Sequence, residues 1–193
     1  MGREKHLKNV LALFKKSPVV NYRSIEMIAG KQYAKQLIRN LVLKGEIKKL
    51  AKGHYTIHDE NSLSVFCFKP GYLGLQDALS FHNLWEQETI PIIITSRRVR
   101  QGIRKVMGSN VLIRRIDKKY LFGFDYYEQS GLYLPYSDVE KTLIDMVYFN
   151  ENISGETLHN IIRKIDRKRL DSYLKTYPSR IRMKVLKYLS RNF

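Results

Sequence analysis

The sequence predicts an α+β fold in which an N-terminal winged helix-turn-helix precedes a mixed α/β region that ends in basic helices. Two observations predict it. Apolar residues recur at helical spacing over the first 44 positions and are followed by a short hairpin. Beyond them, β-branched runs alternate with helical stripes. We therefore expect a first domain over residues 1–60 and a second over 61–193, with an α/β part at 61–150 and a helical part at 151–193.

The first two helices are predicted from the spacing of their apolar residues and from the residues that begin or end them. One apolar face predicts a helix that ends at Ser17-Pro18, because proline lacks an amide hydrogen and disfavours helix before it. Asn21 is a good N-cap for a second helix, Tyr22 to Ala29. The apolar residues of the two helices are Leu7, Val10, Leu11, Phe14, Ile25, Ile28 and Ala29.

A third helix is expected from Lys31 to Lys44, with Gly45 in the left-handed cap position after it. We expect the turn around Gly30 to be a residue or two longer than in the tightest helix-turn-helix proteins. Two short strands, 47–50 and 54–57, then flank a turn at residues 51–53. The apolar face of the third helix is Ala34, Leu37, Ile38, Leu41 and Val42.

The polar chemistry of this first domain fits DNA. A third helix in the major groove presents arginine and lysine to guanine and glutamine to adenine, while basic residues on the wing meet phosphates or the minor groove. The alternative is a winged helix that makes protein contacts alone. Tyr33 is either a residue at the edge of the core or a base or sugar contact. The predicted DNA-binding residues are Lys31, Gln32, Tyr33, Lys35, Gln36, Arg39, Lys48, Lys49, Lys52 and His54.

The middle region predicts a sheet with two helices. Strands are expected at 63–68, 89–96, 111–116, 119–124 and 131–136, with a tight Asp117-Lys118 turn and with Pro135 placing the end of its strand at a sheet edge. Helices are expected at 75–84 and, after a capping box at 137–140, up to Phe149. In the latter, Lys141 and Asp145 are spaced to pair along the helix surface.

Three further sets of apolar residues at helical spacing, each a stripe along a predicted helix, occur in the C-terminal part. Pro178 ends the second of these helices. Basic residues alternate with the stripes, so the helices have a basic solvent face. Contact with DNA, contact with RNA, an acidic protein partner and a merely solvated face all remain open. This secondary basic surface consists of Arg163, Lys164, Arg167, Lys168, Arg169, Arg180, Arg182 and Lys184.

Charge and composition exclude several classes of protein. The net charge of +17 divides into +10 for residues 1–57, 0 for 58–150 and +7 for 151–193. A hydrophobic content of 44% rules out wholesale disorder. The N-terminus lacks the apolar core of a signal peptide, and apolar runs fall short of a membrane span. We expect a cytoplasmic protein without membrane contact, in which Cys67 is a reduced core thiol.

Catalytic and cofactor signatures are missing from the sequence. There is neither a phosphate-binding loop nor an HExxH motif, and the five histidines are scattered. The acidic residues Asp138 and Glu140 are better explained as helix N-terminal residues favoured by the helix dipole. We therefore expect no enzyme activity, no catalytic residue, no cofactor and no metal.

The order of these parts resembles the AbiEi-type antitoxins of bacterial and archaeal toxin–antitoxin systems. The resembling stretches cover nearly the full length. A helix motif after the winged helix matches Gly71, Tyr72, Ala78, Leu79, His82 and Leu84. A later motif matches Glu140, Lys141, Thr142, Leu143 and Asp145. The departures lie between Arg98 and Asn110 and in the C-terminal helices.

The resemblance implies a transcriptional repressor that autoregulates its operon through the winged helix. It also implies an antitoxin that neutralises a nucleotidyltransferase-like toxin, in the usual type IV description without a stable complex. Inverted repeats in the promoter would be bound by two copies, as a weak dimer or as two monomers. One alternative is a stand-alone winged-helix regulator. An alternative of another class is a nucleic-acid-processing enzyme or its accessory subunit.

Overall fold

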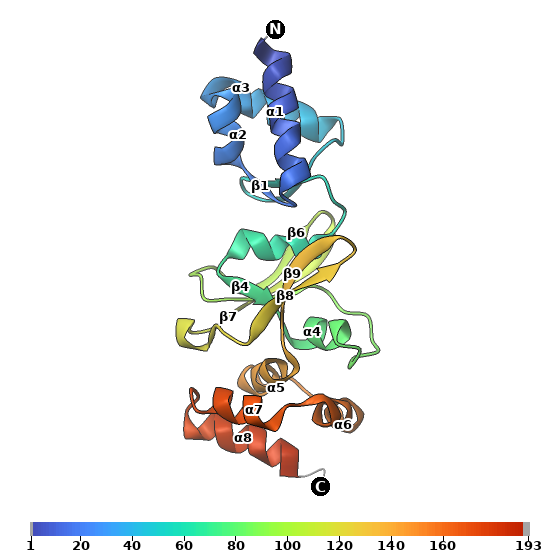
Figure 1. The fold of residues 1–193 in the computed structure, drawn as a ribbon, viewed down its shortest axis with the longest axis vertical. Coiled ribbons are helices and arrows are strands. Elements are labelled where there is room, and N and C mark those ends of the chain that lie inside the picture. Colours follow the sequence, from blue (N-terminus) through green and yellow to red (C-terminus); the bar gives the residue numbers. More distant parts are fainter. Residues whose placement is uncertain (1, 191–193) are drawn as a thin grey trace. The chain divides into compact units, whose positions relative to one another are not determined.

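The computed structural model describes residues 2–190 and has an α+β fold. The chain divides into two compact units (Figure 1). The first comprises the residues up to 67 together with 104–111. The second comprises residues 68–103 and the residues from 112 onward.

The first unit contains a winged helix-turn-helix, in agreement with the predicted helices and hairpin. Antiparallel pairing gives its small sheet the order β1-β3-β2. Val10, Phe14, Ile25 and Leu37 are among the buried residues that join its helices. The elements are α1 (Gly2–Lys16), β1 (Val20–Asn21), α2 (Tyr22–Ala29), α3 (Lys31–Leu43), β2 (Lys48–Ala51) and β3 (His54–Thr56).

The caps of these helices are those that the sequence predicts. The Asn21 side chain accepts a hydrogen bond from the Ser24 amide at 2.9 Å, and Gly45 adopts a φ of 72° after α3. Two expectations were wrong. Gly30 alone separates α2 from α3, so the turn is short. Its φ of 79° lies in the region that favours glycine, which lets a single residue redirect the chain. Val42, expected in the core, is 38% exposed.

A six-stranded mixed sheet of order β6-β7-β5-β4-β9-β8 follows. The pair β5–β7 is parallel, whereas β4–β5 and β8–β9 are antiparallel. The strands are β4 (Gly71–Leu73), β5 (Ile92–Thr95), β6 (Gly102–Val106), β7 (Ser109–Arg115), β8 (Phe124–Gln129) and β9 (Leu132–Ser137).

Helix α5 (Val139–Tyr148) is the centre of the helical part of the second unit. It contacts α4 (Leu75–Phe81), α6 (Gly155–Lys164), α7 (Arg167–Leu174) and α8 (Ser179–Ser190) (Figure 1). The predicted C-terminal stripes supply Leu158, Leu170 and Val185 to this core. All residues of α5 from Val139 to Val147 are buried, so the helix lacks a solvent face.

Several predictions for the middle region were wrong. Residues 61–68 form a 3₁₀ helix instead of a strand, because an apolar run without alternation does not distinguish the two. A second 3₁₀ turn, Lys118–Tyr120, replaces the expected strand at 119–124, with Asp117 as its N-cap. Strands β4, β6 and β8 were not predicted.

The position of Pro135 also differs from the prediction. Its strand β9 lies between β4 and β8, away from the sheet edge. Pro135 stands opposite Tyr126 of β8, while β9 pairs with β4 further along, at Tyr136. The N-cap of α5 is Asp138, whose Oδ1 accepts from the Lys141 amide at 2.7 Å, so the capping box does not begin at Ser137.

Candidate nucleic-acid interface

Helix α3 separates its polar and apolar residues onto opposite faces. Ala34, Leu37, Ile38 and Leu41 are buried in the core of the first unit. The helix contains no aspartate or glutamate, so none of its own side chains neutralises its cations. Exposed on the other face are Lys31, Gln32, Lys35, Gln36 and Arg39, as the sequence predicts.

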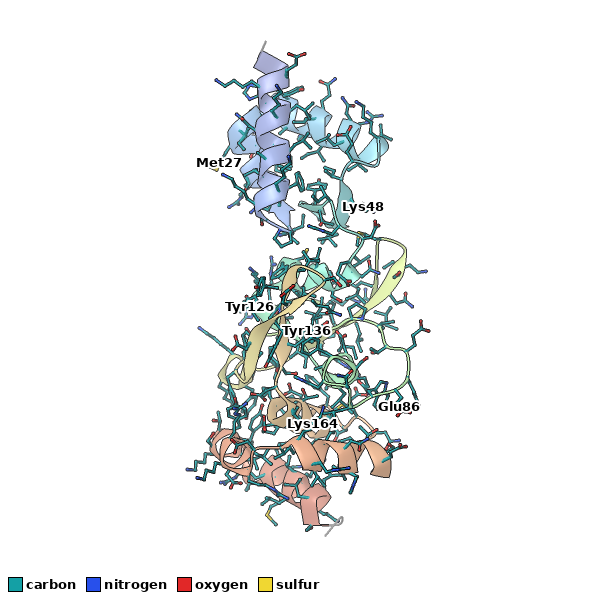
Figure 2. The ribbon with its side chains drawn as sticks, turned by 45° about the vertical axis from the view of Figure 1, so that its right-hand side comes forward. Met27, Lys48, Glu86, Tyr126, Tyr136 and Lys164 are labelled. Atoms are coloured by element: carbon teal, nitrogen blue, oxygen red, sulfur yellow. The ribbon has the colours of Figure 1, made fainter. Side chains whose placement is uncertain are left out.

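The wing residues differ from one another in how they are held. Lys49 and Lys52 are exposed, while Lys48 (labelled in Figure 2) is half-buried and forms an ion pair with Asp59. The Nδ1 atom of His54 lies 3.2 Å from the Lys52 carbonyl oxygen. Lys49 and Lys52 are therefore the better phosphate contacts among the predicted wing residues, since an ion pair lowers the gain from binding a phosphate.

Two further contacts define the edges of this interface. The Tyr22 amide donates to the Gly53 carbonyl at 2.7 Å, which ties the turn of the wing to the start of α2. Tyr33 is half-buried and packs on the core, with its ring centroid 6.3 Å from that of His6. Tyr33 was predicted to be either a residue at the edge of the core or a base or sugar contact, and its position favours the first.

The two motifs that carry the family resemblance meet inside the second unit. The Tyr72 hydroxyl donates to the Asp145 carboxylate at 2.7 Å, and Asp145 forms an ion pair with Lys141. All three side chains are buried. The expected pairing of Lys141 with Asp145 is correct in its partners, but its placement on the helix surface was wrong. Spacing along a helix identifies the pair and carries no information on what covers it.

Aromatic rings surround the Lys141 ammonium group. Its Nζ lies 5.2 Å from the ring centroid of Tyr72, 5.6 Å from that of Phe122 and 5.9 Å from that of Tyr177. Burial lowers the pKa of Lys141 and raises the pKa of Asp145, while the attraction between the two charges opposes both shifts. The Tyr177 hydroxyl is buried beside them and has no hydrogen-bond partner among the described residues.

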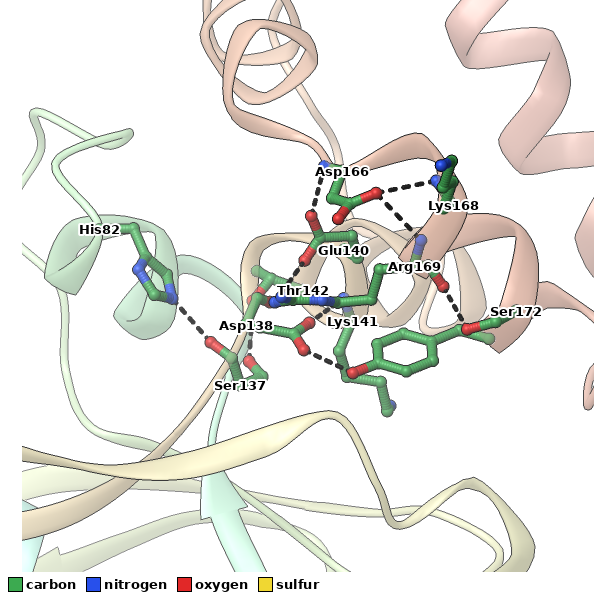
Figure 3. A network of polar contacts seen from close by, with 11 residues as sticks. His82, Ser137, Asp138, Glu140, Lys141, Thr142, Asp166, Lys168, Arg169 and Ser172 are labelled. Atoms are coloured by element: carbon green, nitrogen blue, oxygen red, sulfur yellow. Dashed lines mark hydrogen bonds and ion pairs between the residues drawn. The ribbon is translucent and has the colours of Figure 1, made fainter.

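A second polar network fastens the C-terminal helices to the start of α5 (Figure 3). The Tyr173 hydroxyl donates to Asp138 at 2.7 Å, and the Asp166 amide donates to Glu140 at 2.6 Å. Arg169 lies 3.8 Å from the same Glu140 carboxylate. Nε2 of His82 lies 2.7 Å from the Ser137 carbonyl oxygen. Glu140 is thus more than a helix N-terminal residue, because it bonds a neighbouring helix, and this was not predicted.

The secondary basic surface is only partly available to a ligand. Lys164 donates to the His82 carbonyl at 2.7 Å, and Lys184 donates to the Asn150 side chain at 3.0 Å. Arg169 faces Glu140, so these three predicted residues have internal partners. The exposed members are Arg163, Lys164, Arg167, Lys168, Arg169, Arg180 and Arg182.

The described part of the chain lacks two features that would indicate other functions. Among residues 2–190, no three His, Cys, Asp or Glu side chains lie close enough to hold a metal ion. Within the same residues, no helix has the length and apolar character needed to cross a membrane.

Comparison with known proteins gives a structural neighbour. No protein-family model matches the chain, and no curated protein does. Among solved structures, the chain is similar to the crystal structure of the RV2827C protein from Mycobacterium tuberculosis, with a TM-score of 0.65 and 12% sequence identity. The match covers 98% of this chain and 76% of that one. At this identity the likeness concerns the fold.

Proposed function

We propose that the chain is a sequence-specific DNA-binding transcriptional regulator that reads duplex DNA with helix α3. The observation that carries this proposal is the exposed polar face of α3, backed by a buried apolar face and free of acidic residues. Lysine, arginine and glutamine are the residue types that donate to base edges in the major groove. Lys49 and Lys52 on the wing add phosphate contacts that set the register.

A reporter experiment tests this proposal. The promoter upstream of the gene drives a reporter in cells that express either the wild type or a variant with Lys35, Gln36 and Arg39 replaced by alanine. We expect repression by the wild type and its loss in the variant, with equal amounts of both proteins. A variant with Lys15→Ala and Lys16→Ala, exposed at the end of α1, is the control. Repression that survives in the α3 variant would remove α3 from the role of reading helix.

The antitoxin role that the family resemblance implies is a second proposal. It is supported by the contact between its two motifs, since Tyr72 of the first bonds Asp145 of the second. Coexpression with a nucleotidyltransferase-like protein encoded beside the gene is the test, and rescue of growth is the expected result. A gene without such a neighbour would favour the stand-alone regulator. Loss of integrity of labelled DNA or RNA on incubation would favour the processing enzyme.

A further inference from the structure

The neutral charge of the middle region conceals a sharp separation of charge along the chain. Residues 97–119 contain nine arginine or lysine residues and one acidic residue. The rest of 58–150 holds two basic and ten acidic residues. The balance is therefore an average of one basic segment and the two acidic segments on either side of it. The basic segment includes the end of β7 and the loop after β5.

The sheet topology brings two parts of this basic segment together. Strands β5 and β7 are parallel and adjacent, with Thr95 opposite Arg115, so their carboxyl ends lie side by side. The Ile116 amide donates to the Thr95 carbonyl at 3.0 Å. The Arg115 amide donates to the Gln101 side chain at 2.9 Å, which folds the loop after β5 back onto the end of β7. Both loops belong to the second unit.

Six exposed cations gather at these two strand ends, and we call them the carboxyl-end surface. Asp117 is the acidic residue within the segment 97–119, and its carboxylate is already engaged. Its Oδ1 accepts from the Lys119 amide at 3.2 Å, and its Oδ2 is 4.0 Å from the Lys119 ammonium. The carboxyl-end surface consists of Arg97, Arg98, Arg100, Arg115, Lys118 and Lys119.

We propose that the carboxyl-end surface binds the phosphate backbone of duplex DNA, as a contact separate from helix α3. Like charges on neighbouring strand ends repel one another, and a polyanion relieves that repulsion. Four of the six cations are guanidinium groups, whose planar fork matches two phosphate oxygens. The cations of the carboxyl-end surface are exposed at two adjacent strand ends, so an extended anion with repeating charges can contact several of them at once. The choice of DNA as that anion rests on the function proposed above.

Salt dependence of binding is the first test. The probe is a duplex from upstream of the gene, titrated with the full chain at several salt concentrations. Arg98→Gln combined with Arg115→Gln should reduce the slope of log K against log salt by about 2, because each lost phosphate contact removes about 0.9. The control is Lys175→Gln combined with Lys187→Gln, which removes the same charge from exposed positions on the C-terminal helices.

Tethered cleavage is the second test, and it does not depend on affinity. Cys67 is the single cysteine and is 4% exposed, so Lys118→Cys provides one accessible thiol for an iron–EDTA label. We expect strand cleavage of the bound duplex from Lys118→Cys. Lys175→Cys, labelled in the same way, is the matched control and should cleave less.

The outcomes separate this inference from the function on which it rests. A reduced slope in Arg98→Gln/Arg115→Gln, a smaller change in its control and cleavage from Lys118→Cys support it. An unchanged slope without cleavage, or an equal slope change in the control pair, overturns it while the reading role of α3 stands. That result would be expected if the surface met an acidic protein. A wild type that does not bind the duplex refutes the proposed function itself.

Discussion

Lys141 and Asp145 form an ion pair in which neither side chain reaches solvent. Two charges taken out of water cost several kcal/mol each, and the pair is tolerated because each charge has partners. Asp145 accepts from Tyr72, and three aromatic rings face the Lys141 ammonium. The pair lies in α5, the helix that α4, α6, α7 and α8 all contact.

Breaking this pair should cost far more than removing a surface charge. Lys141→Met leaves a buried carboxylate without its cation and should lower the free energy of unfolding by about 3–5 kcal/mol. Lys141→Met combined with Asp145→Asn should cost less, because the amide still accepts from Tyr72. Urea denaturation of both, with Lys44→Met as an exposed control, gives the comparison. A double variant less stable than the single one would contradict this account.

Two buried tyrosines should respond oppositely to loss of their hydroxyl groups. Tyr72→Phe removes a hydrogen bond to a carboxylate and should cost about 1.5–3 kcal/mol. Tyr177→Phe removes a buried hydroxyl without a partner in the described residues and should be neutral or stabilising. Thermal and urea unfolding of the matched pair measure this difference. Equal losses of unfolding free energy in the two variants would contradict this account, because they would mean that the Tyr177 hydroxyl forms a stabilising hydrogen bond.

The same tyrosines predict a loss of stability at alkaline pH. Burial raises the pKa of Tyr72 and of Tyr177, so above about pH 10 the unfolded chain ionises while the folded chain does not. Stability contributed by a raised pKa is complete below the unfolded value and falls as pH rises. Burial lowers the pKa of Lys141, which acts in the opposite direction up to about pH 10.4.

The measurable window is therefore about pH 10.5 to 12, above the unfolded pKa of lysine. There the free energy of unfolding of the wild type should fall more steeply than that of Tyr177→Phe, by up to about 1.4 kcal/mol per pH unit. Urea titrations at several pH values determine both slopes. Coincident slopes would show that Tyr177 does not resist ionisation in the folded chain.

Gly123 should tolerate substitution less well than Gly131. Both have a positive φ, 70° and 77°, so alanine costs about 1–2 kcal/mol of backbone strain at either position. A Cβ atom at Gly123 would also lie 2.8 Å from Cβ of Lys141, whereas the space at Gly131 is open. Gly123→Ala should therefore be the less stable variant by at least about 1 kcal/mol. Similar unfolding midpoints for the two would argue against close packing of Gly123 on α5.

The winged helix-turn-helix could be predicted closely because its signals are local. Helices α2 and α3 follow from the cap at Asn21, the glycines at 30 and 45 and a 3.6-residue period. The rest of the chain depends on contacts between distant segments. Nothing in the sequence around Lys141 indicates that Tyr72 and Phe122 cover it, and the apolar run at 63–68 has no period that distinguishes a strand from a 3₁₀ helix.

The candidate site was predictable for the same reason. The five polar residues of α3 lie on one helix, so their common face follows from spacing alone. The carboxyl-end surface joins Arg98 to Arg115 through the parallel pairing of β5 with β7, and that pairing has no local signature. The net charge of residues 58–150 does not reveal this surface, because acidic residues elsewhere in the region cancel its charge.

Equilibrium binding to DNA tests the central claim, that α3 reads a base sequence, most directly. The full chain is titrated with a labelled duplex from upstream of its gene and with a scrambled duplex of equal composition, at one fixed salt concentration. We predict that the wild type prefers the upstream duplex by about a thousandfold or more. We also predict that Arg39→Ala weakens this specific binding by about 1–3 kcal/mol while binding of the scrambled duplex changes little. Equal affinity of the wild type for the two duplexes would contradict the account.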